Sequence, residues 1–515
     1  LAEDEPARAA EAYDRLAARW PDNTLAEASR YWSGEAYFED GRYKDAVRVL
    51  TGLLEAHPDG KYAPHAVYTL AWAYYKQEAF TDAHREFAGF LERWPEHELP
   101  AECRLRNGEA LHNLERYDDA LAAYRPLVEN PGKLRPDATL ATAWALYDAG
   151  RTAESAKAFE QGATVEGIGD QAAPSLFNAG NSWVTVEEFE AALKNFSALI
   201  ERFPKHALAP PARYWRAYVM ARLGRHAQAV KHFAALAADG VGGERQPDVL
   251  FGWAESTSAL GRHTEAADLY SRLAKTFPEH DLAARAAYAA ALEHDRAGNT
   301  AEAVEAARRM LKACPDSDLA PLARFALAEY LFRLERYEEA RTALAKVDPA
   351  DVPEETRDAV HYKRGSTAFE VDRAGAAAQS FSAVVENTPK SELAPEAAYM
   401  LGRCAEAEDK PGVAGNRYKT CAANYSESPF AARALLALAQ LALAGERHGE
   451  ALRTVNSLSS DKLPAGLRNY ARLYRAEALV GLERFAEARK AYLEIPAEDP
   501  LHARAVYGAA WADYR

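Results

Sequence analysis

Residues 66–95 read AVYTLAWAYYKQEAFTDAHREFAGFLERWP, and this stretch holds one complete copy of the unit from which the chain is built. Its first ten residues return near the end of the chain as AVYGAAWADY, residues 505–514. Within the stretch, apolar residues recur every three or four positions, which is the period of an α-helix. Pro95 ends the second of two such patterns, because proline cannot continue a helix. The unit therefore predicts a helix, a tight turn, a second helix and a loop.

The same unit recurs along the whole chain with a nearly constant period. We mark each copy by a small residue in its second helix, and successive markers are 37 residues apart, except for one interval of 35 between Ala120 and Ser155. One hairpin of this kind cannot bury its own apolar faces, so neighbouring copies must stack into a continuous core. The thirteen markers are Ala46, Ala83, Ala120, Ser155, Ala192, Ala229, Ala266, Ala303, Ala340, Ala377, Ala414, Ala451 and Ala488.

Other positions of the unit also have a constant character. Five residues before the marker lies a glycine or an acid, and twelve residues before it lies a glycine or an alanine. Glycine at the first position suits a helix end, where the backbone needs a positive φ. Small residues at the second position let two helices approach closely. An aromatic residue follows the marker by four positions in nine units, and a proline follows it by twelve in seven.

Composition limits the kind of partner that the chain can bind. Its 515 residues carry a formal net charge of −15, with 48% apolar and 27% charged residues, which is typical of a soluble folded protein. Phosphates repel such an acidic surface, so a nucleic-acid partner is not expected. No apolar run approaches the length that a membrane helix needs, so direct membrane insertion is not expected either.

No motif for catalysis, cofactor binding or metal binding is apparent in the sequence. Phosphate-binding loops, zinc-protease motifs, nucleophile elbows and dinucleotide fingerprints are all missing, so we predict no catalytic, cofactor-binding or metal-binding residues. The four cysteines have neither CxxC spacing nor a nearby pair of histidines. We expect them to be small buried apolar residues, with Cys404 and Cys421 on opposite arms of one hairpin.

These features resemble the tetratricopeptide repeat, and the resemblance covers essentially the whole chain. It implies an all-α fold, a right-handed superhelical solenoid of helix-turn-helix repeats. The period here is 37 residues, whereas the usual repeat has 34. The extra residues form a recurring phrase after the proline, as in PEHELPAE, PKHALAPP, PEHDLAAR and PKSELAPE. That phrase resembles a subtype found in bacterial envelope proteins, the outer-membrane assembly lipoproteins and the Tol–Pal coordinator. It implies the bacterial periplasm or an association with the outer membrane, with the cytoplasm as the alternative.

We expect one continuous solenoid over residues 1–515. Residues 1–21 fit the second helix of a truncated repeat, residues 22–499 fit thirteen full repeats, and residues 500–515 fit the first helix of another truncated repeat. A solenoid usually ends in a polar capping helix, whereas the last segment presents Val506, Tyr507 and Trp511. We therefore expect an excerpt or a processed form of a longer array. The alternative is a natural last helix packed against the preceding hairpin.

The resemblance also implies a protein-binding groove, because tetratricopeptide repeats line a concave face with their first helices. The residues 15 and 11 positions before each marker should face this groove. We expect the first set, mostly aromatic, to be wedged between successive first helices, and the second, more variable set to contribute specificity. Trp72, Trp144 and Tyr218 are the preferred anchors. The predicted groove residues are Tyr31, Glu35, Tyr68, Trp72, Glu109, Trp144, Phe177, Asn181, Tyr214, Tyr218, Phe251, Glu255, Tyr288, Phe325, Glu329, Tyr362, Tyr399 and Arg403.

The function expected from this resemblance is a non-catalytic scaffold for extended or helical protein segments. Glutamates at the second position would make the groove acidic and favour basic or amphipathic partners. Two alternatives stay open. The array could be a structural spacer that contacts partners through its ends and edges, or it could recruit substrates for a longer enzyme. The sequence assigns no oligomeric state.

Overall fold

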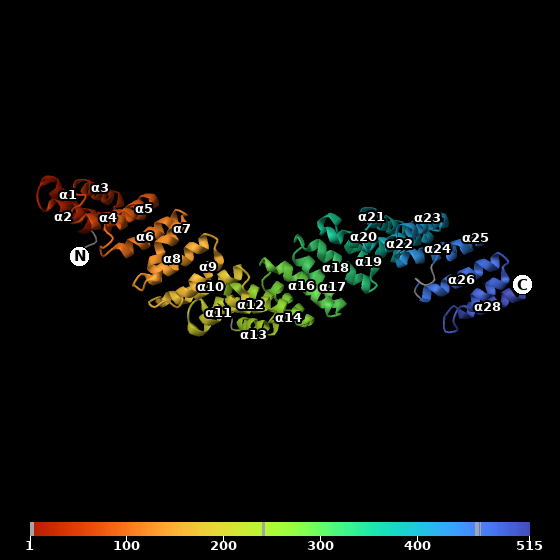
Figure 1. Cartoon of the computed structure of the whole chain (residues 1–515). Helices are drawn as coiled ribbons and strands as arrows, with labels where there is room; N and C mark the ends of the chain where they lie inside the picture. Colours follow the sequence, from red (N-terminus) through yellow and green to blue (C-terminus); the bar gives the residue numbers. More distant parts are fainter. Residues whose placement is uncertain (1–4, 239–242, 459–462, 464) are drawn as a thin grey trace. The chain divides into compact units, whose positions relative to one another are not determined.

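The computed structural model describes residues 5–238, 243–458, 463 and 465–515, and every regular element within these ranges is helical. Within residues 1–260, and again within residues 261–515, consecutive helices pack side by side as hairpins (Figure 1). The expected all-α solenoid of helix-turn-helix repeats is therefore confirmed. Residues 1–4 of the predicted leading helix lie outside the described ranges, as do residues 239–242, 459–462 and 464 of the predicted repeats. Even-numbered helices are the first helices of the repeats and odd-numbered helices are the second.

The contacts divide the chain into two compact units, Leu1–Leu260 and Gly261–Arg515, and each is described by itself. The helices of unit 1 are α1 (Glu5–Arg19), α2 (Ala26–Glu39), α3 (Tyr43–Ala56), α4 (Ala63–Lys76), α5 (Phe80–Arg93), α6 (Pro100–Asn113), α7 (Tyr117–Glu129), α8 (Arg135–Asp148), α9 (Thr152–Gly162), α10 (Ala172–Thr185), α11 (Phe189–Arg202), α12 (Ala209–Arg222), α13 (His226–Ala238) and α14 (Gln246–Ala259). Short 3₁₀ turns at Gly169–Gln171 and Gly243–Arg245 precede α10 and α14.

Unit 2 continues the same alternation of first and second helices. Its helices are α15 (His263–Thr276), α16 (Leu282–Arg296), α17 (Thr300–Ala313), α18 (Ala320–Arg333), α19 (Tyr337–Leu344), α20 (Glu354–Glu370), α21 (Ala374–Asn387), α22 (Ala394–Ala407), α23 (Pro411–Asn424), α24 (Pro429–Ala444), α25 (His448–Asn456), α26 (Ala465–Gly481), α27 (Phe485–Leu493) and α28 (His502–Tyr514). A 3₁₀ turn at Pro349–Asp351 precedes α20.

The core of each hairpin forms around the small residues that the sequence marks. All thirteen marker residues are completely buried. The glycine or alanine twelve positions earlier lies on the facing first helix. A Cβ atom added to Gly108 would lie 2.2 Å from the ring of Tyr124, which is fully buried four residues after its marker. Gly402 and Tyr418 have the same relation at the same distance. These glycines therefore make room for the aromatic ring that fills each hairpin.

The residue at the turn between the two helices has a positive φ in all thirteen repeats. Gly41 has a φ of 75°, and the N–H of Arg42 donates to the carbonyl oxygen of Tyr37 at 2.8 Å, which closes the helix in a Schellman motif. The positive φ predicted for the turn glycines is confirmed. The acids at this position adopt it as well: Glu78, Glu115, Glu187, Glu335, Asp372, Asp409, Glu446 and Glu483 have φ between 54° and 60°.

The basic residue after the turn begins the second helix. Arg42 precedes α3 directly, and its guanidinium lies 2.8 Å from the carboxylate of Asp45 in the first turn. Arg116 and Asp119 repeat the contact at 2.7 Å at the start of α7. An acid in the first turn also suits the positive end of the helix dipole. These charged residues therefore define helix boundaries and are not evidence of a ligand site.

The recurring phrase after the proline is a cap for the next first helix. The Nδ1 atom of His97 accepts a hydrogen bond from the N–H of Leu99 at 3.3 Å. His206 and His280 repeat this bond two residues before a leucine, and the hydroxyl oxygen of Ser391 takes their place before Leu393. The third residue of the phrase therefore satisfies a backbone donor that the proline loop leaves open.

Candidate functional site

The predicted groove residues occupy two positions, four residues apart, on successive first helices. Residues with this spacing share one face of a helix, so the two sets form a strip within each unit, and we call this surface the first-helix surface. It consists of the eighteen predicted residues together with Leu105, Leu140, Leu292, Ser366, Leu436, Gln440, Leu473 and Glu477 at the same repeat positions. The strip is described within each unit separately.

The residues 15 positions before each marker, which we call the upstream set, pack on the second helices. The ring of Tyr68 lies 6.3 Å from that of Phe87, and Tyr362 lies 5.6 Å from Phe381, each pair edge to face. Phe177 makes the same edge-to-face contact within its own repeat, and Tyr214 and Tyr399 make tilted ring contacts at the same positions. The rings therefore rest mainly on the aromatic residue that follows the marker by four positions, rather than only between successive first helices as we expected. Tyr31, Phe251 and Phe325 are buried, and the other aromatics of the set are half-buried.

Burial changes the chemistry of the tyrosines in this set. It raises the pKa of Tyr214 to about 12, and it raises the pKa of Tyr68, Tyr288 and Tyr362 above the usual tyrosine value. These hydroxyls therefore stay protonated near neutral pH and can donate hydrogen bonds at the edge of the surface.

The residues 11 positions before each marker, which we call the downstream set, stay accessible in every repeat. Each of its thirteen members is partly or well exposed, and Trp144 is the most exposed large aromatic among them, with 44% of its surface accessible. Their identities change from repeat to repeat, from glutamate through asparagine to tryptophan. A series of accessible, changing side chains on otherwise regular helices is what a specific interface requires.

Neighbouring repeats are tied to one another across this surface. The guanidinium of Arg106 on α6 lies 4.9 Å from the ring centre of Trp72 on α4, and it also pairs with Glu109 at 2.7 Å. Glu35 on α2 accepts a hydrogen bond from Thr69 on α4. Lys363 on α20 lies 3.7 Å from Glu329 on α18. Several side chains chosen as contact candidates therefore also hold successive first helices together.

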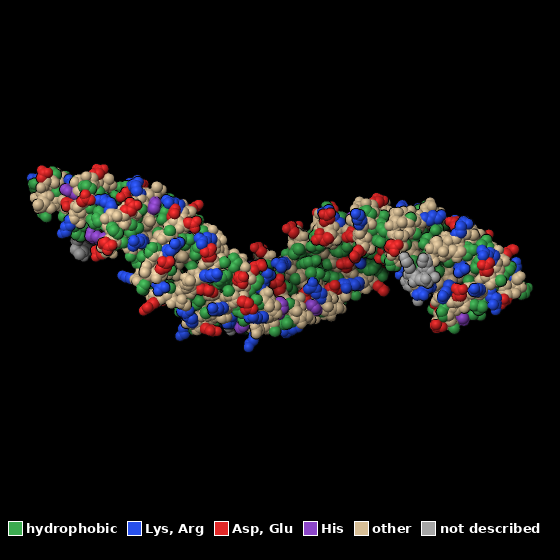
Figure 2. Space-filling model, in the orientation of Figure 1, with side chains coloured by type: hydrophobic (Ala, Val, Ile, Leu, Met, Phe, Trp, Pro, Cys, Tyr) green, Lys and Arg blue, Asp and Glu red, His purple; other side chains and the backbone are tan. Residues whose placement is uncertain are grey.

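The same pairs reduce the negative charge that we expected on this surface. Glu109 and Glu329 have cationic partners, and Glu477 lies 2.6 Å from Arg504. Burial nevertheless raises the pKa of Glu477. Figure 2 shows acidic and basic side chains interspersed over the face in view. A basic partner would therefore have to compete with the protein's own cations at several of these glutamates.

Other aromatic residues lie beside each of the three preferred anchors in unit 1. Trp72 lies 5.5 Å from Tyr75, Trp144 lies 5.9 Å from Tyr147, and Trp215 lies 5.5 Å from Tyr214 and 5.4 Å from Tyr218. Sequence reasoning missed three of these residues, Tyr75, Tyr147 and Trp215. A search at three positions after the downstream set would have found Tyr75 and Tyr147, because that spacing lies on the same helix face.

One group of metal-ligand residues was also missed. Ligand atoms of His65, His97 and Glu98 all lie within 4.8 Å of one another, from α4 and the loop before α6. His97 already accepts the Leu99 N–H through Nδ1, so its Nε2 carries the hydrogen when the ring is neutral. A metal ion could bind through Nε2 only if this helix cap were given up. The observed hydrogen bond therefore favours a structural role for His97.

The cysteines offer no reactive site in this arrangement. Cys103, Cys404 and Cys421 are completely buried, as predicted, and the last two lie on α22 and α23 of one hairpin. Burial raises the pKa of the Cys103 thiol to about 12 and that of Cys421 to about 11, so neither forms a thiolate near neutral pH. Cys314 differs from the prediction because it follows the last turn of α17 and is partly exposed.

Comparisons with known protein families agree with the repeat geometry. Residues 105–173, 177–243, 251–318 and 288–351 match the family described as the tetratricopeptide repeat. Residues 23–125 match the YfiO family, described as an outer membrane lipoprotein. Comparison with curated protein sequences finds no match. Among the described residues, no helix has both the length and the apolar character that a membrane span requires.

Three solved structures are among those to which the chain is similar. A tetratricopeptide repeat protein from Parabacteroides merdae is 17% identical over 49% of this chain and 93% of its own, with a TM-score of 0.33. Yeast Tom70 is 15% identical over 95% and 96%, with a TM-score of 0.31. The Naa15/Naa10 complex bound to HypK-THB is 14% identical over 99% and 78%, with a TM-score of 0.38. These values are too low to support an inference of function.

The hairpins, the buried markers and the family matches together define an α-helical repeat protein. The chain contains tetratricopeptide repeats, which the family match places at four positions between residues 105 and 351. Repeats of this family form scaffolds for protein–protein interaction, so a protein is the class of partner that the family supports.

Proposed function

We propose that the chain is a non-catalytic scaffold that binds extended or helical protein segments along the first-helix surface. The observation that carries the proposal is the downstream set, which is accessible in all thirteen repeats and changes from one repeat to the next. Trp144 and Tyr147 are the strongest anchors, because they are 44% and 46% exposed and their rings lie 5.9 Å apart. The net charge of −15 argues for a protein partner and against nucleic acid.

We further propose a place in the bacterial cell envelope, either in the periplasm or associated with the outer membrane. The similarity of residues 23–125 to an outer membrane lipoprotein family supports this placement, as does the 37-residue period. Fractionation of native cells tests it. Recovery of the protein with the periplasm or the outer membrane is the expected result, and recovery with the cytoplasm would contradict it.

Site-specific photo-crosslinking tests the binding surface in the native cell. Benzoylphenylalanine is placed at Trp144 or Arg403 on the first-helix surface, and at the exposed second-helix residues Arg309 or Lys419 as matched controls. Crosslinked proteins are identified by mass spectrometry. A partner captured only from the first two positions is the expected result. Capture only from the second-helix positions would contradict the proposal.

The binding energy is then measured with the purified partner. Replacement of Trp144 and Tyr147 by alanine should weaken binding about tenfold or more, as expected for the loss of exposed aromatic anchors. Trp511→Ala is the control, since this tryptophan is 45% exposed at the corresponding position of α28. Circular dichroism verifies that both variants fold.

A structural arm is the second candidate function. The contacts of Trp72, Glu35 and Glu329 with neighbouring first helices favour it, because side chains that tie repeats together are less available to a partner. Under this alternative the Trp144 and Tyr147 variant binds as well as the unmodified chain, and crosslinks arise at second-helix positions.

A further inference from the structure

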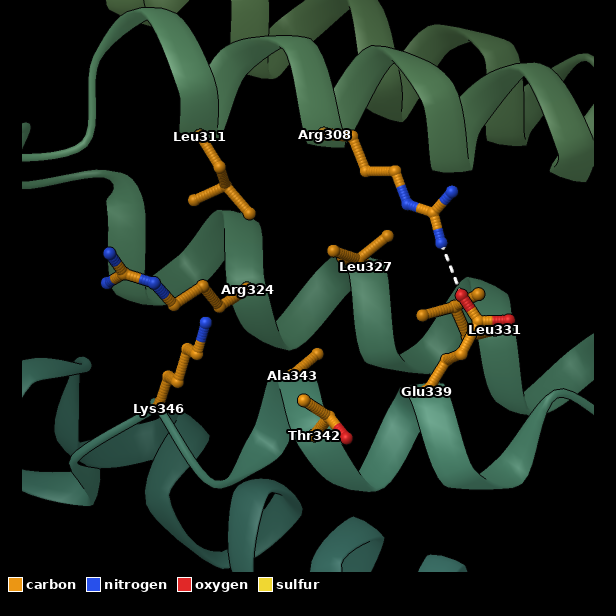
Figure 3. A pocket seen from close by; sticks show the side chains of 9 residues that line it. All are labelled: Arg308, Leu311, Arg324, Leu327, Leu331, Glu339, Thr342, Ala343 and Lys346. Carbon is orange, nitrogen blue, oxygen red and sulfur yellow. Dashed lines mark hydrogen bonds and ion pairs between the residues drawn. The ribbon is translucent and has the colours of Figure 1, made fainter.

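A pocket of about 370 Å³ opens on the second-helix side of unit 2 (Figure 3). Helices α17 and α19 form its two walls, and α18 lies between them. None of the predicted groove residues lines it. The lining residues are Arg308, Leu311, Arg324, Leu327, Leu331, Glu339, Thr342, Ala343 and Lys346. Figure 2 shows hydrophobic side chains gathered over the segment from α16 to α20.

The pocket exists because α19 is short. It has 8 residues, whereas the preceding second helix, α17, has 14. After Leu344 the chain turns inward and buries Val347 and Val352. The guanidinium of Arg364 fixes this turn, since it donates to the carbonyl oxygen of Leu344 at 3.1 Å and also to that of Val347. The turns of helix that would continue the α19 wall are therefore missing, and the space beside α17 stays open.

The interior of the pocket is apolar. Leu327 and Leu331 on α18 are buried, with 8% and 2% of their surfaces accessible, and Leu311 on α17 is half-buried beside them. Three leucines at the base of an accessible pocket offer contact area to an apolar side chain from outside.

At one end of the pocket, the charged side chains are paired with groups of opposite charge. The guanidinium of Arg308 lies 2.6 Å from the carboxylate of Glu339, and Arg336 pairs with the same carboxylate at 2.7 Å. The hydrogen bond from Arg336 is the main reason that the pKa of Glu339 is below its usual value. Glu339 therefore stays ionised and has two cations of its own.

The other end carries two cations without an anion. Figure 3 shows Lys346 extending toward the aliphatic stem of Arg324, on the side of the pocket away from Arg308 and Glu339. Arg324 donates to the backbone carbonyl of Pro315 at 3.3 Å, and within the described ranges neither side chain has a carboxylate partner. Two cations at one end of a pocket attract an anion, and a carboxylate that binds there can accept charge-assisted hydrogen bonds from them.

We propose that this pocket binds an acidic protein segment. A leucine- or phenylalanine-sized side chain of the partner packs on Leu311, Leu327 and Leu331, and a flanking aspartate or glutamate binds Arg324 and Lys346. The volume is near the lower end of the range for ligand pockets, so it accommodates one or two side chains rather than a folded domain. The inference deepens the scaffold function, but it uses a surface separate from Trp144 and Tyr147.

The test measures the binding of labelled peptides to the full chain at low salt, by fluorescence anisotropy. The acidic peptide GDELFDEG is compared with the neutral peptide GNQLFNQG, which keeps the same apolar centre. We expect the acidic peptide to bind at least about tenfold more tightly, with an affinity that falls as salt is added. Equal binding of the two peptides would overturn the proposal.

Three variants locate the interaction. Lys346→Glu should weaken binding of the acidic peptide about tenfold. Arg309→Glu is the matched control, because Arg309 is an exposed cation at the same repeat position on α17 and does not line the pocket. Thr342→Trp fills the pocket without a change of charge, and it should abolish binding. An equal loss in Lys346→Glu and Arg309→Glu, or full binding by Thr342→Trp, would overturn the proposal.

A third ligand distinguishes a protein segment from a fatty carboxylate. Dodecanoate has an apolar chain and one carboxylate, so its displacement of the peptide at a lower concentration than GDELFDEG itself would assign the pocket to a lipid and overturn the proposal. The alanine variant of Trp144 and Tyr147 should bind the acidic peptide normally. The alanine variant tests binding of the native partner, and Lys346→Glu tests binding of the acidic peptide. The two results are independent, so the scaffold proposal and the pocket proposal can each be contradicted without the other.

Discussion

Two helices with nearly the same sequence have different surroundings. Residues 66–75 of α4 and residues 505–514 of α28 share seven of their ten residues, among them Tyr68 with Tyr507 and Trp72 with Trp511. In α4, both rings lie 6.3 Å from Phe87 of α5, and Arg106 of α6 covers Trp72. In α28, Tyr507 is 75% exposed.

The face toward the preceding helices is the same in the two copies. Ala66 and Ala73 in α4 are fully buried, and their counterparts Ala505 and Ala512 in α28 are 1% and 4% exposed. The preceding hairpin therefore buries the small residues, and the following helices bury the aromatic ones. An aromatic residue of the upstream set therefore contributes mainly to packing, and a partner can contact only its accessible edge.

The largest expected effect comes from removing the partner ring in α5. Phe87→Ala should cost about 3–5 kcal/mol of stability, because a fully buried ring leaves a cavity under Tyr68 and Trp72. Chemical denaturation followed by circular dichroism measures the loss. An α4 region that unfolds at an unchanged denaturant concentration would show that Phe87 does not cause the difference between the two copies.

The next effect concerns a position at which the copies differ. Thr69 in α4 corresponds to Gly508 in α28, where an added Cβ atom would lie 2.4 Å from the ring of Tyr492. Gly508→Thr should therefore cost about 1–3 kcal/mol through overpacking. Leu50 stands in the place of Tyr492 in the hairpin before α4, so Tyr492→Leu in the same chain should recover part of the loss. Additive costs in a double-mutant cycle would contradict this coupling.

A smaller effect of opposite sign is expected at the turn that follows α4. Glu78 has a φ of 59°, which costs a residue with a side chain about 1 kcal/mol relative to glycine. Glu78→Gly should stabilise the hairpin by about 0.5–1 kcal/mol, and Gly41→Ala, at the same turn one repeat earlier, should destabilise by a similar amount. Thermal and chemical denaturation of both variants measure the shifts. Shifts of the same sign would contradict the strain argument.

The smallest effect is expected on the exposed face of α28. Tyr507→Ala should change the stability by less than about 0.5 kcal/mol, because three quarters of the side chain is already accessible. Tyr68→Ala in α4 is the matched substitution and should cost several times more. Similar losses in the two variants would mean that the following helices contribute little to the packing of this position.

Much of the fold could be predicted because it depends on local periodicity. The marker alanines and the turn glycines occur at fixed intervals, and each has a local reason for its identity. The acids at the turn were not assigned a conformation, since Glu78 has no intrinsic preference for a positive φ. It adopts one because both flanking helices are fixed by their packing.

The candidate site could be predicted only in part, because contacts between repeats do not follow the period. Arg106 covers Trp72 through its own length and rotamer, and no interval in the sequence indicates that contact. The phrase PEHEL was visible as a pattern, but its helix-capping role became clear only from the bond between His97 and Leu99. The pocket beside α19 depends on where Val347 and Val352 turn inward, which is a tertiary property of one repeat.

The shortened second helices also affect how the array comes apart. In a linear array each repeat is stabilised by its nearest neighbours, so stability is distributed along the chain rather than held in one core. In unit 2, α19, α25 and α27 have 8, 9 and 9 residues, against 14 in α21 and α23. Hydrogen exchange should be fastest around these short helices. Unfolding would begin there and divide unit 2 into blocks, with the blocks around α15–α17 and α21–α23, whose second helices all have 14 residues, the last to open.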